Sequence, residues 1–145
     1  LRTEPDYISH SEILWGRARN ETSWSTDLEA VLKTEFSESA DNVTRIRARS
    51  ENEIAGLACT RVVVEGHRSA LILEDLYVDP RFRRQGLARL LLREVEHEAV
   101  RRGVDWIGLE SGLRNTSAHD FFEAIGFTTV SKTMLKPVKA ASDAE

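Results

Sequence analysis

The chain has 145 residues, of which 41% are hydrophobic and 30% are charged, and its formal net charge is −4. This length suits one globular domain with its own core and leaves little room for a second. The net charge disfavours nucleic-acid binding, which normally requires a clustered basic surface. No apolar run approaches the roughly 18 residues that a membrane span needs, so we expect no membrane partner.

Cys59 is the only cysteine, so a disulfide within the chain is impossible. This cysteine usage fits a reducing compartment. The polar start of the chain, residues 1–6, does not resemble a signal peptide. Together these features predict a cytoplasmic protein in which Cys59 is a buried side chain of the apolar run 54–59.

Residues 6–36 are predicted to be helical in two pieces. Asp6 is the expected cap of the first helix. Residues 19–23 indicate a break, after which Ser25 or Thr26 caps a second helix whose apolar residues recur at helical spacing.

From about residue 43 the hydrophobic period changes to two, which predicts strands. We expect strands over 43–48, 54–64 and 70–78, separated by turns at 50–53 and 65–68. Because the turns are short, these strands should form an antiparallel meander.

The rest of the chain alternates helix and strand. We expect a helix from Gly86 to Gly103, a strand over 104–110, a helix from Asn115 or Thr116 to Gly126, and a strand over 127–135. The order is αα-βββ-α-β-α-β, and the unit over 70–110 should be a right-handed parallel crossover. The pattern therefore predicts an α/β fold with a mixed sheet.

Residues 78–88 join the third strand to the following helix. Such a junction leaves backbone N–H groups unpaired, and the helix dipole adds partial positive charge there. Gly86 and Ala88 have little or no side chain, so a bulky anion can approach the backbone. Four arginines bring positive charge to the turn: Arg81, Arg83, Arg84 and Arg89. The pattern is typical of a pyrophosphate cradle, although a strand–helix turn with an exposed basic surface explains the same residues.

The turn matches a known family signature. Arg83-x-x-Gly86-x-Ala88 resembles the Gln/Arg-x-x-Gly-x-Gly/Ala motif of the GCN5-related N-acetyltransferases (GNAT). Residues 74–80 resemble that family's fourth strand, and residues 115–127 resemble its second signature. The resemblance implies a GNAT acyl-CoA N-acyltransferase fold in a single N-acetyltransferase domain.

The resemblance also implies a plan for the domain, which would span residues 1–145. Acceptor-side helices would occupy 1–42, the sheet and the CoA-binding core 43–136, and a flexible tail 137–145. Acetyl-CoA would be the co-substrate, without a metal, and its pantetheine arm would fill a gap between the splayed fourth and fifth strands.

The residues that would bind CoA follow from the same resemblance. Main-chain groups of Leu76, Tyr77 and Val78 would pair with the pantetheine amides like a short added strand. The turn would hold the pyrophosphate through a run of backbone N–H groups that begins at Arg83 or Arg84 and continues through Gln85, Gly86, Leu87 and Ala88 to Arg89. Asn115 would contact the CoA arm, and a helix N-cap is the alternative role for it.

Acyl transfer to an amine requires removal of a proton from the amine, and Glu74 and Asp75 are the candidate bases. Strand alternation places these two side chains on opposite faces, so one of them is expected to face the acceptor. Glu74 is preferred, because a Glu near this point often has this role in the family. Its alternative role is an ion pair with Arg61 or Arg68.

One residue departs from the family pattern, since Phe122 stands where many members have the Tyr that protonates the leaving thiolate. Either no protein acid is used, or water, Tyr77 or His119 replaces it. The Val78 N–H is expected to polarise the thioester oxygen.

The expected acceptor is a primary amine of a small molecule. Residues 1–70 hold 12 acidic and 9 basic side chains, and this small excess of negative charge favours a cationic acceptor. The pairs Leu14–Trp15 and Asn115–Thr116 also resemble the aminoglycoside 6'-N-acetyltransferases. The alternatives are acetylation of a protein N-terminus or lysine, and an inactive CoA-binding domain. Many members of the family are dimers, so the resemblance also allows a homodimer.

Overall fold

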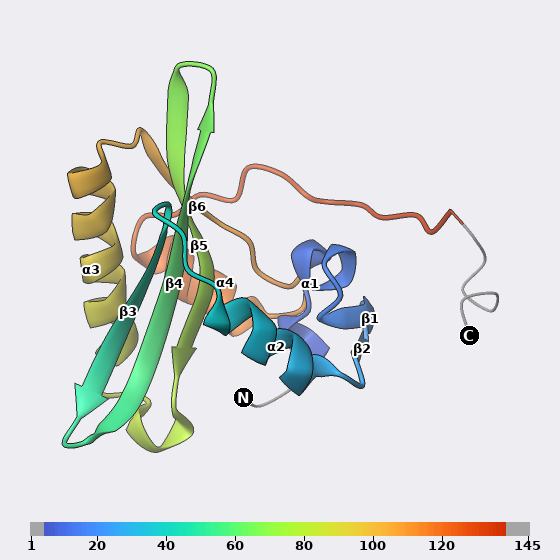
Figure 1. The fold of residues 1–145 in the computed structure, drawn as a ribbon, viewed down its shortest axis with the longest axis horizontal. Coiled ribbons are helices and arrows are strands. Elements are labelled where there is room, and N and C mark those ends of the chain that lie inside the picture. Colours follow the sequence, from blue (N-terminus) through green and yellow to red (C-terminus); the bar gives the residue numbers. More distant parts are fainter. Residues whose placement is uncertain (1–4, 139–145) are drawn as a thin grey trace. The chain divides into compact units, whose positions relative to one another are not determined.

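The computed structural model describes residues 5–138. The predictions for residues 1–4, and for the tail over 139–145, therefore lie outside the described residues. Figure 1 shows the elements in chain order. The chain divides into two compact units, one over Glu38–Glu110 and one made of the residues before and after it.

The unit over Glu38–Glu110 is built on a four-stranded sheet with the order β3-β4-β5-β6. Its strands are β3 (Val43–Ser50), β4 (Glu53–Glu65), β5 (Arg68–Val78) and β6 (Trp106–Leu109). The first three pair antiparallel, and β6 is parallel to β5. These pairings confirm the predicted meander, crossover connection and mixed sheet, because short turns join antiparallel neighbours and a parallel pair requires a longer connection such as α3.

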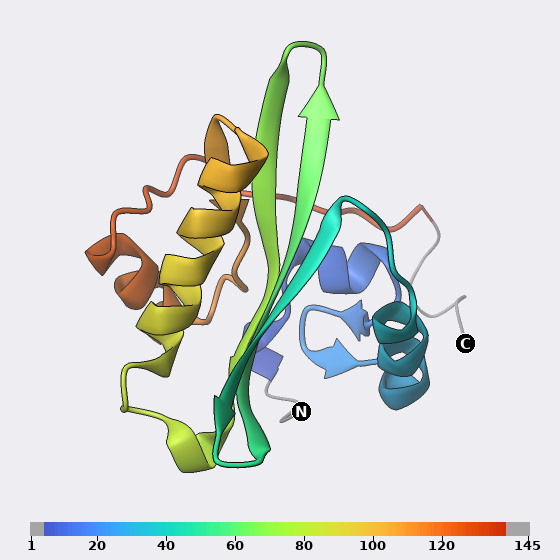
Figure 2. The same ribbon diagram turned by 60° about the vertical axis from the view of Figure 1, so that its left-hand side comes forward.

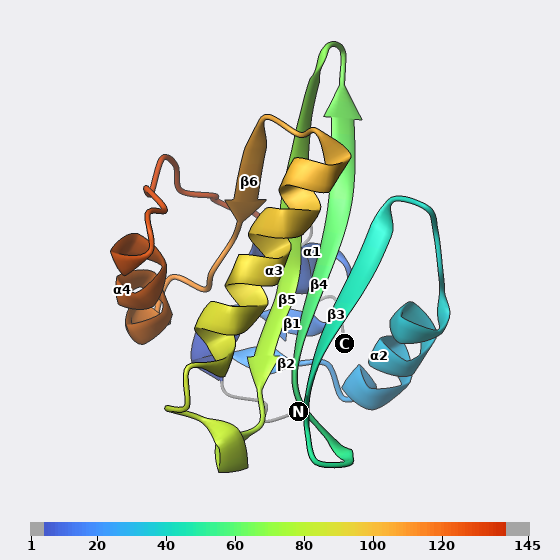
Figure 3. The same ribbon diagram turned by 90° about the vertical axis from the view of Figure 1, so that its left-hand side faces the viewer.

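The crossover helix is α3 (Leu87–Arg102), and Figures 2 and 3 show it lying along one face of the sheet. Its buried apolar residues are Leu91, Leu92, Val95 and Ala99. Helix and sheet approach closely at Gly56, where an added Cβ would lie 3.0 Å from Leu91 Cδ1 and 3.0 Å from the Tyr77 carbonyl oxygen. Only glycine therefore allows this packing without a shift of the backbone.

A charged side chain joins α3 to the edge strand β3. Glu98 is only 6% exposed, yet it accepts hydrogen bonds from Arg101 Nη2 at 2.6 Å, Arg102 Nε at 2.8 Å and Thr44 Oγ1 at 3.0 Å. The hydrogen bond from Arg102, followed by that from Arg101, lowers the pKa of Glu98 to about 2. The carboxylate thus stays ionised in the folded protein and fully bonded, which makes its burial tolerable.

The second unit contains short elements. They are η1 (Pro5–Tyr7), α1 (His10–Leu14), β1 (Ala18–Asn20), β2 (Ser23–Trp24), α2 (Leu28–Ser37) and α4 (Thr116–Ala124). The predicted cap at Asp6 is wrong, because α1 begins after Ser9. The Glu12 carboxylate accepts from Ser9 N at 3.1 Å and from Ser9 Oγ, which fixes the start of the helix there.

The predicted break over 19–23 is a small hairpin that ends the first helical piece early. Asn20 Oδ1 accepts from Thr22 N at 2.9 Å and from Thr22 Oγ1 at 3.0 Å, which closes the turn between β1 and β2. α2 begins at Leu28, directly after Asp27, so neither Ser25 nor Thr26, the predicted caps, is the residue next to the helix. The Ser25 Oγ accepts from Asp27 N at 3.2 Å in the turn before α2.

The predicted strand over 127–135 is wrong, because this segment is not in any sheet of the described chain. Val130 is 87% exposed and Met134 89%. The alternating pattern identified a face suited to burial, but a strand also requires hydrogen bonds to a neighbouring strand.

No helix within 5–138 is long and apolar enough to cross a membrane.

We predict that Glu98→Gln lowers the free energy of unfolding at pH 7 by about 2–3 kcal/mol, because the bonded carboxylate has a lower pKa folded than unfolded. This stabilisation is present above the ordinary carboxyl pKa of 4.5 and is lost as the pH falls towards about 2. Urea unfolding of both proteins at pH 7, 4 and 2.5 measures the difference, which should shrink at each step.

The matched control is Glu94→Gln, which removes an exposed carboxylate from the same helix. It should change the free energy of unfolding by less than about 0.5 kcal/mol. A difference for Glu98→Gln that stays constant from pH 7 to pH 2.5 would contradict the proposed role of ionisation.

Candidate active site

The ladder between β5 and β6 stops before β5 ends. Its last pair is Leu73 with Leu109, whereas β4 continues to pair with β5 as far as Val78 opposite Gly56. Within the described chain, residues 74–78 are therefore paired along one edge only. Figure 3 shows β6 ending beside β5 while β5 continues. β5 and β6 are the strands that correspond to the family's fourth and fifth, so their separation after Leu73 is the splay that the resemblance implies.

The hydrogen-bonding alternation decides which groups lie on the open edge of β5. Asp79 N donates to Ala55 O at 2.8 Å, which makes Val78 and Gly56 a non-hydrogen-bonded pair. The main-chain groups of Val78 and Leu76 therefore point away from β4, and those of Tyr77 point towards it. Leu76 and Val78, rather than Tyr77, present backbone groups at the open edge.

A β-bulge interrupts β5 where the ladder with β6 ends. Asp75 pairs with Cys59 and Leu73 pairs with Thr60, so Glu74 is an extra residue without a partner position on β4. Such a residue shifts the strand's side-chain alternation. No signal in the sequence marked this bulge, because the residues around it read as an ordinary strand.

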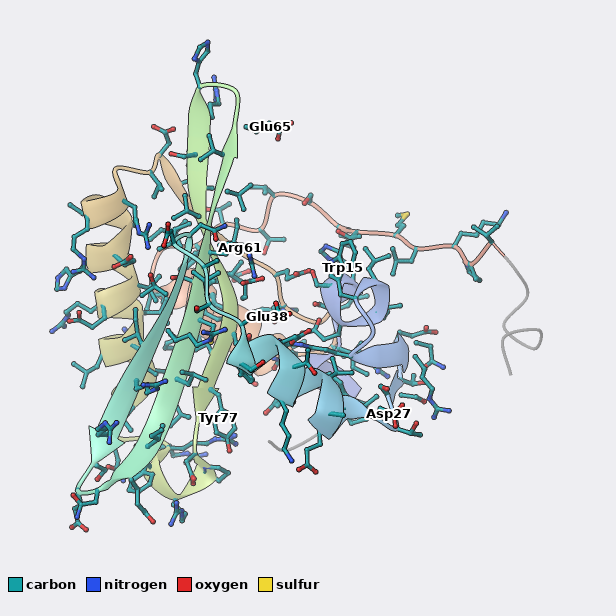
Figure 4. All side chains as sticks on the ribbon, viewed as in Figure 1. Trp15, Asp27, Glu38, Arg61, Glu65 and Tyr77 are labelled. Carbon is teal, nitrogen blue, oxygen red and sulfur yellow. The ribbon has the colours of Figure 1, made fainter. Side chains whose placement is uncertain are left out.

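The bulge corrects the prediction that Glu74 and Asp75 lie on opposite faces. Asp75 shares a face with its pairing partner Cys59, and so does Arg61, two residues further along β4. Arg61 Nε donates to Glu74 Oε1 at 3.1 Å, which places the Glu74 carboxylate on that face as well. Figure 4 labels Arg61 on the sheet. Both candidate bases thus lie together on the face opposite α3.

The turn after β5 begins with a capped 3-10 helix, η2 (Pro80–Phe82). Asp79 Oδ1 accepts from Arg81 N at 2.9 Å, and the Arg81 side chain pairs with Asp79 at 3.2 Å and with Glu53 at 3.3 Å. The hydrogen bond from the Arg81 side chain lowers the pKa of Asp79. Two carboxylates therefore compensate the Arg81 charge, so this arginine adds less positive charge to the turn than its position in the sequence predicts.

The second half of the turn presents open backbone donors. In the described part of the chain, the N–H groups from Arg84 to Ala88 donate to no protein acceptor. Arg84 has φ 63° and Gly86 has φ 79°, and these left-handed conformations reverse the chain before α3 begins. Backbone N–H groups at a turn and a helix N-terminus form a concave site for an anion.

The structure thus places most of the predicted CoA-binding residues on one strand end and one turn. They are Leu76, Tyr77, Val78, Arg83, Arg84, Gln85, Gly86, Leu87, Ala88 and Arg89. Asn115 belongs to the other unit, where it occupies the N-cap position of α4 without a capping hydrogen bond from its side chain. Its CoA contact stays a prediction.

The remaining candidates also lie in the second unit. The Phe122 ring packs against Phe121, with centroids 5.4 Å apart, and against Phe127, at 5.7 Å. His119 Nε2 lies 2.9 Å from Gly112 O, which fits a structural role. Trp15 is 75% exposed. Among residues 5–138, no group of three or more His, Cys, Asp or Glu is arranged to hold a metal ion.

A mixed sheet with an open strand edge that leads into the N-terminus of a helix is an α/β arrangement whose backbone groups suit a ligand with an anionic end. The chain matches the model of the Acetyltransferase (GNAT) family over residues 10–127. This match covers most of the chain, so the protein belongs to the GNAT family.

Among curated proteins, a [Ribosomal protein bS18]-alanine N-acetyltransferase of Salmonella typhimurium is 32% identical over 95 residues. The match covers 66% of this chain and 62% of that protein, so the chain spans about three fifths of the length of this relative.

Solved structures show the same fold at lower identity. A putative acetyl transferase from Pyrococcus furiosus has a TM-score of 0.66 and 21% identity, over 95% of this chain and 83% of that one. The aminoglycoside acetyltransferase AAC(6')-Iy, in complex with a CoA-containing bisubstrate analogue, has a TM-score of 0.66 and 20% identity, over 92% and 96%.

We predict that Gly86→Ala weakens CoA binding about tenfold or more, because a Cβ at this left-handed residue projects into the approach of the anion and disturbs the turn. Nothing in the described protein lies within 4 Å of that added Cβ, so any loss beyond backbone strain belongs to the ligand. Isothermal titration with CoA measures the change.

Gly66→Ala is the matched control, since Gly66 has φ 62° and equally open surroundings at the β4–β5 turn. Both variants should lose about 1 kcal/mol of stability from the left-handed conformation. Equal CoA affinity in the two variants would contradict a ligand at Gly86.

Proposed function

We propose that this protein transfers the acetyl group of acetyl-CoA directly to an amine, without a metal. The open edge of β5, which leads into the unpaired N–H groups from Arg84 to Ala88, carries the proposal. Membership of the GNAT family supports it, and so does a similar fold crystallised with a CoA-containing analogue. The strand edge suits the amides of pantetheine, and the turn suits the diphosphate.

The end of β5 also suits the thioester. The Val78 carbonyl accepts from Arg83 Nε at 3.0 Å, so the remaining open main-chain group of Val78 is its N–H. We assign this N–H to the thioester oxygen, where it would stabilise the charge that develops during attack. The Leu76 main chain would pair with the pantetheine arm, and the contact of Asn115 with CoA is part of the same proposal.

In the proposed reaction, the neutral amine attacks the thioester carbon, the C–N bond forms, and the C–S bond breaks to release CoA thiolate. Glu74 would take the amine proton through a water, with Asp75 beside it as the alternative base. Arg61 would orient the Glu74 carboxylate. Since Phe122 has no acidic proton, the thiolate would take its proton from water, or from Tyr77 or His119.

We propose a primary amine of a small molecule as the acceptor. The two carboxylates on the face opposite α3 support an amine acceptor, because they attract a cation to the site. An aminoglycoside-like amine is one such acceptor, since several enzymes of similar fold carry aminoglycoside acetyltransferase names. The cytoplasm is the proposed compartment.

A protein N-terminus is the second candidate acceptor. It is favoured by the relatives named for acetylation of an alanine of a ribosomal protein, which match this chain at 32% identity. Acetyl transfer to the α-amine of a protein and to the amine of a small molecule follow the same chemistry. The two acceptors differ in the size of the surface that the enzyme must bind.

We predict that the protein binds acetyl-CoA at micromolar concentration and releases free thiol when an acceptor is present, as is usual for such enzymes. Titration with acetyl-CoA, followed by a thiol-release assay, tests both steps. The panel should contain aminoglycosides, polyamines, and peptides with a free N-terminal alanine. Turnover with peptides alone selects the second candidate, binding without turnover selects an inactive CoA-binding domain, and no binding rejects the proposal.

We also predict that Glu74→Gln lowers kcat about 100-fold and leaves the KM for acetyl-CoA within about twofold, because it removes a base and no CoA contact. Asp75→Asn should have the smaller effect, and the reverse order would assign the base to Asp75. Glu65→Gln, at the distal end of β4 (Figure 4), is the control and should leave kcat unchanged.

A further inference from the structure

The side chain of Arg83 reaches back across the turn to the end of β5. Its Nε donates to Val78 O at 3.0 Å, and this hydrogen bond is partly buried. The neighbouring Arg84 is exposed, and Arg81 is paired with Asp79 and Glu53. The Arg83 side chain thus bonds to the end of β5, at the strand's open edge.

With this bond, one peptide group is hydrogen-bonded on both sides, an arrangement that we call the clamp. The peptide between Val78 and Asp79 donates its N–H to Ala55 O at 2.8 Å on the β4 side. The same peptide accepts from Arg83 through its carbonyl on the open side. Held from both sides, the end of β5 keeps the adjacent Val78 N–H in a fixed direction.

The clamp also connects the strand to the open donors of the turn. Arg83 directly precedes Arg84, where the left-handed stretch begins. Its own backbone N–H makes only a long bond, 3.5 Å, to Pro80 O. In the described chain, the N–H groups from Arg84 to Ala88 bond to no protein acceptor, whereas the Gly86 carbonyl accepts from Leu90 N at 3.1 Å and ties this segment to α3.

We propose that Arg83 is a positioning residue that fixes the spacing between the thioester end and the diphosphate end of the CoA site. This inference rests on the proposed function. A ligand gripped at two ends binds more tightly than either half, because the second contact forms at high effective concentration, and this gain requires the correct spacing. The Arg83 side chain would thus act through the backbone rather than as a charge on the phosphates.

The test compares a whole ligand with its halves. In Arg83→Gln, we expect the affinity for CoA to fall about tenfold, while the affinities for ADP and for pantetheine each change less than about twofold. Isothermal titration measures all three ligands for both proteins. The KM for acetyl-CoA should rise about tenfold, with a smaller change in kcat.

Two further variants separate positioning from charge. Arg83→Lys keeps the charge but loses the guanidinium Nε, so it should behave like Arg83→Gln. Arg93→Gln removes an exposed arginine from α3 and should leave all affinities unchanged. The melting temperature of each variant confirms that it is folded before the titrations are compared.

Several outcomes would overturn the inference. An ADP affinity that falls as far as the CoA affinity, with a deficit that disappears at high salt, would show that Arg83 acts as a phosphate charge. CoA affinity close to the wild-type value in Arg83→Lys would show the same. Unchanged CoA affinity in Arg83→Gln would remove the role altogether, whereas wild-type protein that fails to bind CoA would reject the proposed function itself.

Discussion

The early end of the ladder between β5 and β6 is the constraint on which the candidate site depends. After Leu73 the strand β5 is held by β4 alone, so one edge of its last residues has backbone groups that no neighbouring strand uses. Antiparallel alternation then assigns those groups to Leu76 and Val78. Gly56 lies opposite Val78, and its missing side chain lets α3 pack directly against this end of the sheet.

Backbone geometry contributes more to the proposed anion site than the charges of Arg81 and Arg83 do. Arg81 is compensated by Asp79 and Glu53, and Arg83 is bonded to Val78 O. What the turn presents is a run of N–H groups from Arg84 to Ala88 at the positive end of the α3 dipole. A site of this kind tolerates changes in surface charge better than changes at a left-handed residue such as Gly86.

The face of the sheet opposite α3 holds the residues that we propose to attract and deprotonate the acceptor amine. The bulge at Glu74 brings two carboxylates to that face, where Arg61 holds one of them. An acceptor amine needs both attraction and deprotonation, and a pair of carboxylates can divide these tasks.

The sequence by itself determined the meander, the crossover helix and the turn with its signature, because these depend on local periodicity, short turns and the glycines at 86 and 103. Tertiary structure decided the features that depend on a pairing partner. The strand expected over 127–135 is absent from the sheets of the described chain, and the bulge at Glu74 appears only in the register with β4. The bond from Arg83 to Val78 likewise arises only when the turn folds back on the strand, since hydrogen bonds between separate segments leave no periodic trace in a sequence.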